Sequence, residues 1–244
     1  MTEAATRRGL SGGALKCIAI AAMTVGHAAW VFLPGCRTDA LTLSLHLIGR
    51  LAAPIMMFFI AEGYHHTRSV KKYIGRMLGF SLVSHFAYAL LFEEPFLPFQ
   101  TTAFNQTSIL WALSMGLIAL AVYHSKNLKP WQKAGAIGLC LAAAFCANWS
   151  TPAAGAVLFM GIHRGNFKRQ MLWLALFMAF FAAVYAIFLN PVYGLLQMAV
   201  VAAIPLLRRY NGQRGAGGKG LQWFFYVYYP AHMLLLALVR IYTA

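Results

Sequence analysis

Unbroken apolar runs, most of them 17 to 24 residues long, follow one another along almost the whole chain. A helix needs about 20 apolar residues to cross a bilayer, so most of the runs are long enough to form a membrane span. In lipid every backbone polar group needs an internal partner, which leaves helices or a closed barrel. The runs lack the alternation of polar and apolar residues that barrel strands show, so they predict helices.

The charge content agrees with a lipid environment, because only 10% of the residues are charged, against about 25% in soluble chains. We therefore predict an all-α polytopic transmembrane helical bundle of about nine spans. Spans of roughly 20 residues leave no room for a soluble domain, so residues 1–244 are expected to form a single integral-membrane domain. The expected spans are 15–33, 43–66, 74–92, 105–124, 131–147, 152–164, 171–189, 191–208 and 221–241.

The positions of the charges predict an orientation. If the N-terminus is cytoplasmic, seventeen of the 20 basic residues fall on the cytoplasmic side, whereas Asp39, Glu93 and Glu94 fall outside. Basic residues in short loops stay in the cytoplasm, so we expect a cytoplasmic N-terminus and an external C-terminus. The net charge of +15 is then mostly explained by the topology, and anionic lipid headgroups are expected partners of the basic residues. It does not indicate nucleic acid, because the basic residues are spread over five short segments without a DNA-binding module.

Two polar residues stand out in the first span. Lys16 and His27 are eleven residues apart, close to three helical turns, so both are expected on one face about 16 Å apart. His27 is either a neutral imidazole bonded to a carbonyl of a neighbouring helix or a general base in a water-accessible cavity. Gly26 beside it permits the close approach of another backbone or a ligand.

The second span carries Arg50 roughly 10 Å inside its outer end and Pro54 near its middle. A guanidinium at that depth needs a carboxylate, several carbonyls or an anionic substrate. Glu62 lies three and four residues before His65 and His66, a spacing that permits a structural pair. A metal site is disfavoured there, because di-iron bundles need two Glu-x-x-His helices and further carboxylates.

The last span holds His232, preceded by Tyr228 and Tyr229 at helical spacing. Aromatic residues in such a stripe are more often packing residues than chemical groups. Their hydroxyls can nevertheless supply the hydrogen bonds that a histidine inside a bundle needs.

Four stretches together resemble the TraX family of bacterial inner-membrane proteins, which is named for a protein that acetylates the N-terminus of conjugative pilin. They are LKCIAIAAMTVGHAAWVF, IGRLAAPIMMFFIAEGYHHTRSVKKYIGRML, LLRRYNGQRG and KGLQWFFYVYYPAHMLLL. In the distantly similar acyltransferase-3 family a basic residue precedes a catalytic histidine by ten intervening residues, and Lys16 and His27 match that spacing. The TraX pattern usually has Asp before this histidine, whereas this chain has Gly26.

The resemblance implies an acetyltransferase that takes acetyl-CoA as co-substrate and an amine or hydroxyl acceptor from the outer side, with no metal. His27 is then the expected base or, in a covalent variant, the group that is acetylated, and His232 or Arg50 stabilises the oxyanion. The phosphates of coenzyme A suit the basic inner segments. The residues expected to bind the co-substrate are Lys16, Glu62, His66, Lys71 and Lys72.

Two other classes of function remain open. A proton-coupled transporter is disfavoured because Glu62 is the single acidic residue expected within a span, and proton relays use such acids. A pilus or envelope assembly factor without catalysis is the third possibility.

Overall fold

The computed structural model describes residues 9–97, 100, 105–215 and 218–243, and this part of the chain is helical apart from loops and two isolated bridges. Its elements, in chain order, are α1 (Gly12–Phe32), α2 (Ala40–Gly49), α3 (Ala52–His66), α4 (Val70–Phe92), α5 (Ile109–Tyr123), α6 (Pro130–Ala143), α7 (Ser150–Ile162), α8 (Phe167–Phe188), α9 (Pro191–Gln197), the 3-10 helix η1 (Met198–Ala203), α10 (Ile204–Arg208) and α11 (Gly218–Thr243).

Every predicted span corresponds to a helix or to consecutive helices. Within the described residues, six helical segments are long and apolar enough to cross a membrane. The helices α5, α6 and α7 are shorter, at 15, 14 and 13 residues. The all-α class is thus confirmed, whereas the number of crossings and the orientation of the termini stay predictions.

Several helices begin at a side chain that caps the first turn. The side chains of Ser11, Asp39, Ser69 and Asn166 each accept a hydrogen bond from a backbone N–H in the following turn. Such caps satisfy donors that a helix start leaves unpaired. At Asp39 the backbone N–H and the hydroxyl of Thr42 lower the pKa of the carboxyl to about 2.

Two predicted spans are interrupted. The segment 43–66 divides at Arg50 and Leu51 into α2 and α3. Pro54 has no N–H to donate to the carbonyl of Arg50 four residues earlier, which explains a distortion at this point. The segment 191–208 changes from α9 through η1 to α10, and Pro205 likewise cannot donate to the carbonyl four residues before it.

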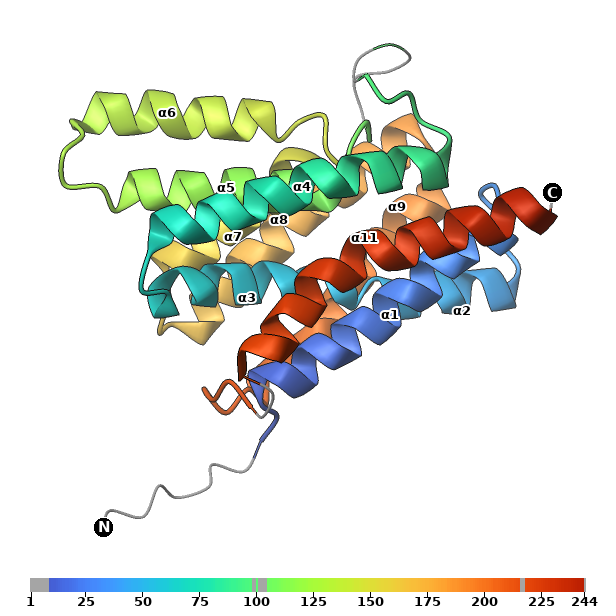
Figure 1. Cartoon of the computed structure of the whole chain (residues 1–244), viewed down its shortest axis with the longest axis horizontal. Helices are drawn as coiled ribbons and strands as arrows, with labels where there is room; N and C mark the ends of the chain where they lie inside the picture. Colours follow the sequence, from blue (N-terminus) through green and yellow to red (C-terminus); the bar gives the residue numbers. More distant parts are fainter. Residues whose placement is uncertain (1–8, 98–99, 101–104, 216–217, 244) are drawn as a thin grey trace.

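The helices α5 and α7 pack against each other, and most of their residues are buried. They pack closely because a Cβ on Gly116 would lie 2.7 Å from the carbonyl oxygen of Ala154, and small residues let membrane helices approach. At the edge, α6 lies beside α5 (Figure 1), and no residue of α6 is buried.

The first and last helices, α1 and α11, run side by side in the same direction (Figure 1). Near its end α11 is fixed to α4, because Arg240 donates hydrogen bonds to the carbonyls of Leu90 and Leu91 and pairs with Glu93 at 3.0 Å. The seam between α1 and α11 contains the principal candidate site.

Candidate functional site

Two predicted site histidines meet in this seam. His27 Nδ1 lies 2.8 Å from His232 Nε2, and the two rings are nearly parallel with centroids 5.0 Å apart. His232 is 5% exposed. The rings of Phe92 and Tyr229 contact His27 edge-on. The structure therefore holds both imidazoles in one place among aromatic side chains.

The hydrogen bonds define the proton positions of the neutral pair. His232 Nδ1 lies 2.9 Å from the carbonyl oxygen of Tyr228; a carbonyl only accepts, so Nδ1 carries the proton. In neutral His232, Nε2 is then the acceptor, and His27 Nδ1 donates to it. This leaves His27 Nε2 with a free lone pair, the form that a general base requires.

The pair can also take up one proton without losing its hydrogen bond. A proton added at His27 Nε2 leaves the Nδ1–H donor directed at His232 unchanged. The resulting imidazolium is supported through His232 by the carbonyl of Tyr228. Both nitrogens of His232 are engaged in this arrangement, so His232 positions His27 and has no N–H left to donate to an oxyanion.

Further contacts continue along the same seam toward the start of α1. The hydroxyls of Thr24 and Tyr228 are 2.7 Å apart. The Nζ of Lys16 lies 5.1 Å from the ring centroid of Phe59 and 5.5 Å from that of Phe225. Lys16 and His27 both face α11, as their spacing predicts.

Arg50 lies next to this site because of a backbone contact. A Cβ on Gly26 would lie 2.9 Å from the Cα of Gly49, so α1 and α2 touch one residue before His27 and Arg50. The guanidinium of Arg50 lies 5.3 Å from the ring centroid of Trp149. The structure thus brings His27 and His232 into contact and places the backbone of Arg50 beside that of His27.

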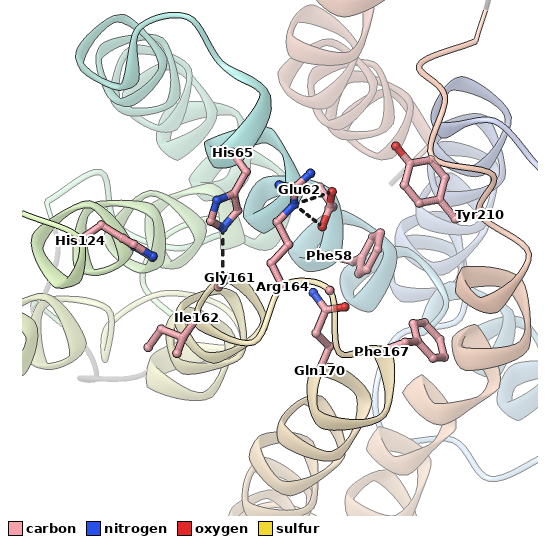
Figure 2. Close-up of a pocket in the computed structure, with 11 residues that line it drawn as sticks. Phe58, Glu62, His65, His124, Gly161, Ile162, Arg164, Phe167, Gln170 and Tyr210 are labelled. Atoms are coloured by element: carbon pink, nitrogen blue, oxygen red, sulfur yellow. Dashed lines mark hydrogen bonds and ion pairs between the residues drawn. The ribbon is translucent and has the colours of Figure 1, made fainter. Parts of the chain in front are cut away.

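A cavity of about 520 Å³ opens at the end of the bundle where α3, α5 and α7 finish and α8 begins. Figure 2 shows Glu62 and Arg164 facing one another at its wall. Arg164 Nε lies 3.3 Å from both carboxylate oxygens of Glu62, and its Nη2 lies 3.0 Å from His66 Nε2. Because His66 Nε2 accepts from this guanidinium, its 3.3 Å contact with Glu62 is not an ion pair.

Other polar groups complete the cavity wall. His65 Nε2 donates to the carbonyl of Gly161 at 3.0 Å, and His124 and Gln170 line the same space (Figure 2). Burial raises the pKa of the Tyr210 phenol, so it stays a neutral hydrogen-bond donor. Cavities of a few hundred cubic ångströms accommodate small ligands.

The residues predicted to bind the co-substrate are not in one place. Glu62 lines the cavity, and His66 contacts the cavity residue Arg164. Lys16 lies in the seam, and Lys71 and Lys72 are exposed at the start of α4. Within the described part of the chain, no three His, Cys, Asp or Glu residues are grouped to bind a metal.

Sequence reasoning missed Arg164 as the partner of Glu62, and it missed the role of the Tyr228 carbonyl. Arg164 is 102 residues from Glu62, so no local pattern connects them. A backbone carbonyl has no sequence signal at all. His85 is a satisfied core residue, because it donates to the carbonyl of Phe96 at 2.8 Å.

A helical bundle with apolar spans and a hydrogen-bonded histidine pair inside it defines a multi-pass membrane protein with an internal polar site. The chain belongs to the TraX family, whose model, described as TraX protein, matches residues 11–240. It is 27% identical over 238 residues to the probable fimbrial assembly protein FimC, serogroup H1, of Dichelobacter nodosus, covering 93% of this chain and 95% of the relative. No solved structure matches the chain.

Proposed function

We propose that this protein is an acetyltransferase of the bacterial inner membrane. It moves an acetyl group from cytosolic acetyl-CoA to an amine or hydroxyl of an extracytoplasmic acceptor, such as a pilin N-terminus or an envelope glycan. The observation that carries the proposal is the chain of hydrogen bonds from Tyr228 through His232 to His27. It presents a neutral imidazole with a free Nε2, and this group suits proton removal from a nucleophile.

In the proposed transfer, His27 accepts one proton from the acceptor and returns it to the leaving thiolate. His27 Nε2 takes the proton of the acceptor amine or hydroxyl while the nucleophile attacks the thioester carbonyl. The tetrahedral intermediate then collapses by breaking its bond to sulfur. The proton held by His27 passes to the departing thiolate, so the products are the acetylated acceptor and free coenzyme A.

The route of the co-substrate follows the packing of aromatic rings. Tyr210 lines the cavity and its ring also contacts Phe59, the ring beneath Lys16. From Lys16 to His27 the distance along α1 is about 16 Å, which the thin pantetheine arm of coenzyme A can span. The nucleotide would then stay at the cavity end of the bundle while the thioester reaches His27.

A second candidate is a pilus assembly factor without catalysis, which is favoured by the printed name of the fimbrial relative. That function predicts a complex with a pilus or envelope partner and no change in the partner's mass. A transporter predicts flux of a solute into liposomes. Glu62 supports that class poorly, because Arg164 pairs with it.

The mass of surface proteins and glycans distinguishes these functions. We expect one acceptor to lose about 42 Da, the mass of an acetyl increment, when the gene is deleted, and to regain it when the gene is restored. A His27→Ala gene should restore the protein but not the mass. If all surface masses are unchanged while pilus assembly fails, the assembly factor is the better account.

A further inference from the structure

Arg50 has no acidic partner within the described part of the chain. The four acidic residues described there have other partners: Asp39 pairs with Arg37, Glu62 with Arg164, Glu93 with Arg240, and Glu94 accepts from Gln106. Arg50 Nε is buried and has no hydrogen-bond partner among the described residues. A guanidinium inside a membrane bundle needs an anion or several acceptors to offset its desolvation.

One turn before Arg50, His46 presents a second set of unused polar atoms. It is 1% exposed, and neither ring nitrogen has a hydrogen-bond partner among the described residues. Its ring lies 4.5 Å from Trp30 and 5.4 Å from Tyr193. Buried polar atoms are nearly always hydrogen-bonded, so two unpartnered groups on one helix face indicate a ligand site.

The position of this pair relative to His27 is defined by the contact of Gly26 with Gly49. Trp30, which covers His46, is one turn beyond His27 on α1. His46 is seven residues from the capping residue Asp39, or about 10 Å along the helix. His46 therefore lies between the level of His27 and the predicted outer surface, whereas Arg50, one turn deeper, is about level with His27. Both are too deep for a lipid headgroup at the end of the span.

The ring that packs against Arg50 is held by an unusual backbone. Trp149 and Ser150 are consecutive residues with positive φ, at 63° and 48°, a conformation that costs energy in residues other than glycine. The ring of Trp149 also stacks on Phe181 at 5.3 Å. A strained backbone at Trp149 and Ser150 thus places an aromatic ring against the guanidinium of Arg50.

We infer that His46 and Arg50 bind the oxyanion of a carboxylate or phosphate group on the acceptor. Arg50 offers a planar fork of N–H donors, and a neutral His46 adds one donor from the preceding turn. The assignment to the acceptor rests on the proposed acetyl transfer, whereas the anion site itself does not. The sequence predicts a role for Arg50 on the reaction oxyanion, and the unpartnered His46 beside it favours an anion that approaches from outside.

Anion binding is measured by thermal unfolding of the purified, delipidated protein. Succinate and inorganic phosphate are compared with chloride at equal ionic strength. A saturable rise of at least about 2 °C is expected with one of the two oxyanions. Arg50→Gln should abolish the rise, and Arg50→Lys should weaken half-saturation about tenfold because the fork is lost.

Two further variants keep this test informative if Arg50→Gln does not fold. His46→Phe retains the ring shape and the charge of Arg50, so it should fold and bind the anion more weakly. Arg37→Gln removes an exposed arginine of the outer loop and should leave the rise unchanged. An equal rise in wild type and Arg50→Gln overturns the site. Stabilisation by phosphatidylglycerol alone makes the ligand a lipid and overturns the assignment to the acceptor.

Acetyl transfer to two matched amines tests the acceptor role. Glutamyl amide and glutaminyl amide differ by one carboxylate, and wild type should show a KM about tenfold lower for the first. Arg50→Gln should remove this preference. An equal fall in kcat for both amines would make Arg50 an oxyanion stabiliser and contradict the inference. If gene deletion changes no surface mass but succinate still binds through Arg50, the proposed function fails and the anion site stands.

Discussion

His27 is held inside an apolar helix by a hydrogen bond to His232 and by contacts with aromatic rings. The position of His27 relative to α2 is fixed by the close approach of α1 to α2 at Gly26, where any side chain would meet the Cα of Gly49. The resemblance to the TraX pattern predicts Asp at this position. In this chain the space for that carboxylate is filled by the backbone of α2, and His232 orients the imidazole instead.

Gly26→Asp tests whether His232 has replaced a carboxylate as the group that orients His27. The new side chain must push α2 away from α1, so we expect destabilisation of about 1–3 kcal/mol, or roughly 2–4 °C in the unfolding midpoint for each kcal/mol. Acetyl transfer should fall with it. Thermal unfolding in detergent and transfer from acetyl-CoA measure the two effects.

Gly138→Ala is the matched control, because a Cβ at Gly138 in α6 meets no atom within 4 Å. It should be neutral or slightly stabilising. A Gly26→Asp protein that is as stable as wild type and faster would contradict the account, since an orienting carboxylate would then fit beside His27.

At the scale of elements, local patterns predicted the helices well and their partners poorly. Apolar runs mark α1, α4 and α8 because a span is a property of consecutive residues, and Pro54 signalled the break between α2 and α3. The meeting of His27 with His232 joins residues 205 positions apart. Periodicity within either helix gives the face that each residue occupies but not the helix that it faces.

The break between α2 and α3 provides a prediction at this scale. Pro54→Ala supplies the missing N–H to the carbonyl of Arg50, so the segment should become a more regular helix. We expect an unchanged or higher unfolding midpoint. Acetyl transfer should fall roughly tenfold or more, because Arg50 would shift relative to His27.

Pro130→Ala is the corresponding control. Pro130 is the first residue of α6, where a helix makes no use of the N–H, and neither stability nor transfer should change appreciably. Full activity in Pro54→Ala would show that the break does not position Arg50.

At the scale of the whole molecule, the polar features follow one another across the bundle. The cavity with Glu62 and Arg164 lies at one end, and Lys16 and then His27 follow along α1. Arg50 is about level with His27 on the neighbouring α2, and His46 lies one turn further toward the predicted outer surface. This order suits a reaction in which the donor stays on one side of the membrane and the acceptor reaches the centre from the other.

Transfer across a sealed membrane tests the central claim most directly. Proteoliposomes are loaded with acetyl-CoA, and glutamyl amide, whose charges keep it from crossing lipid, is supplied outside. We predict that acetylated glutamyl amide accumulates outside only when acetyl-CoA is inside, and that His27→Ala lowers the rate at least about a hundredfold at equal thermal stability. Near-normal transfer by His27→Ala, or a product that forms only inside the vesicles after uptake of the amine, would contradict the account.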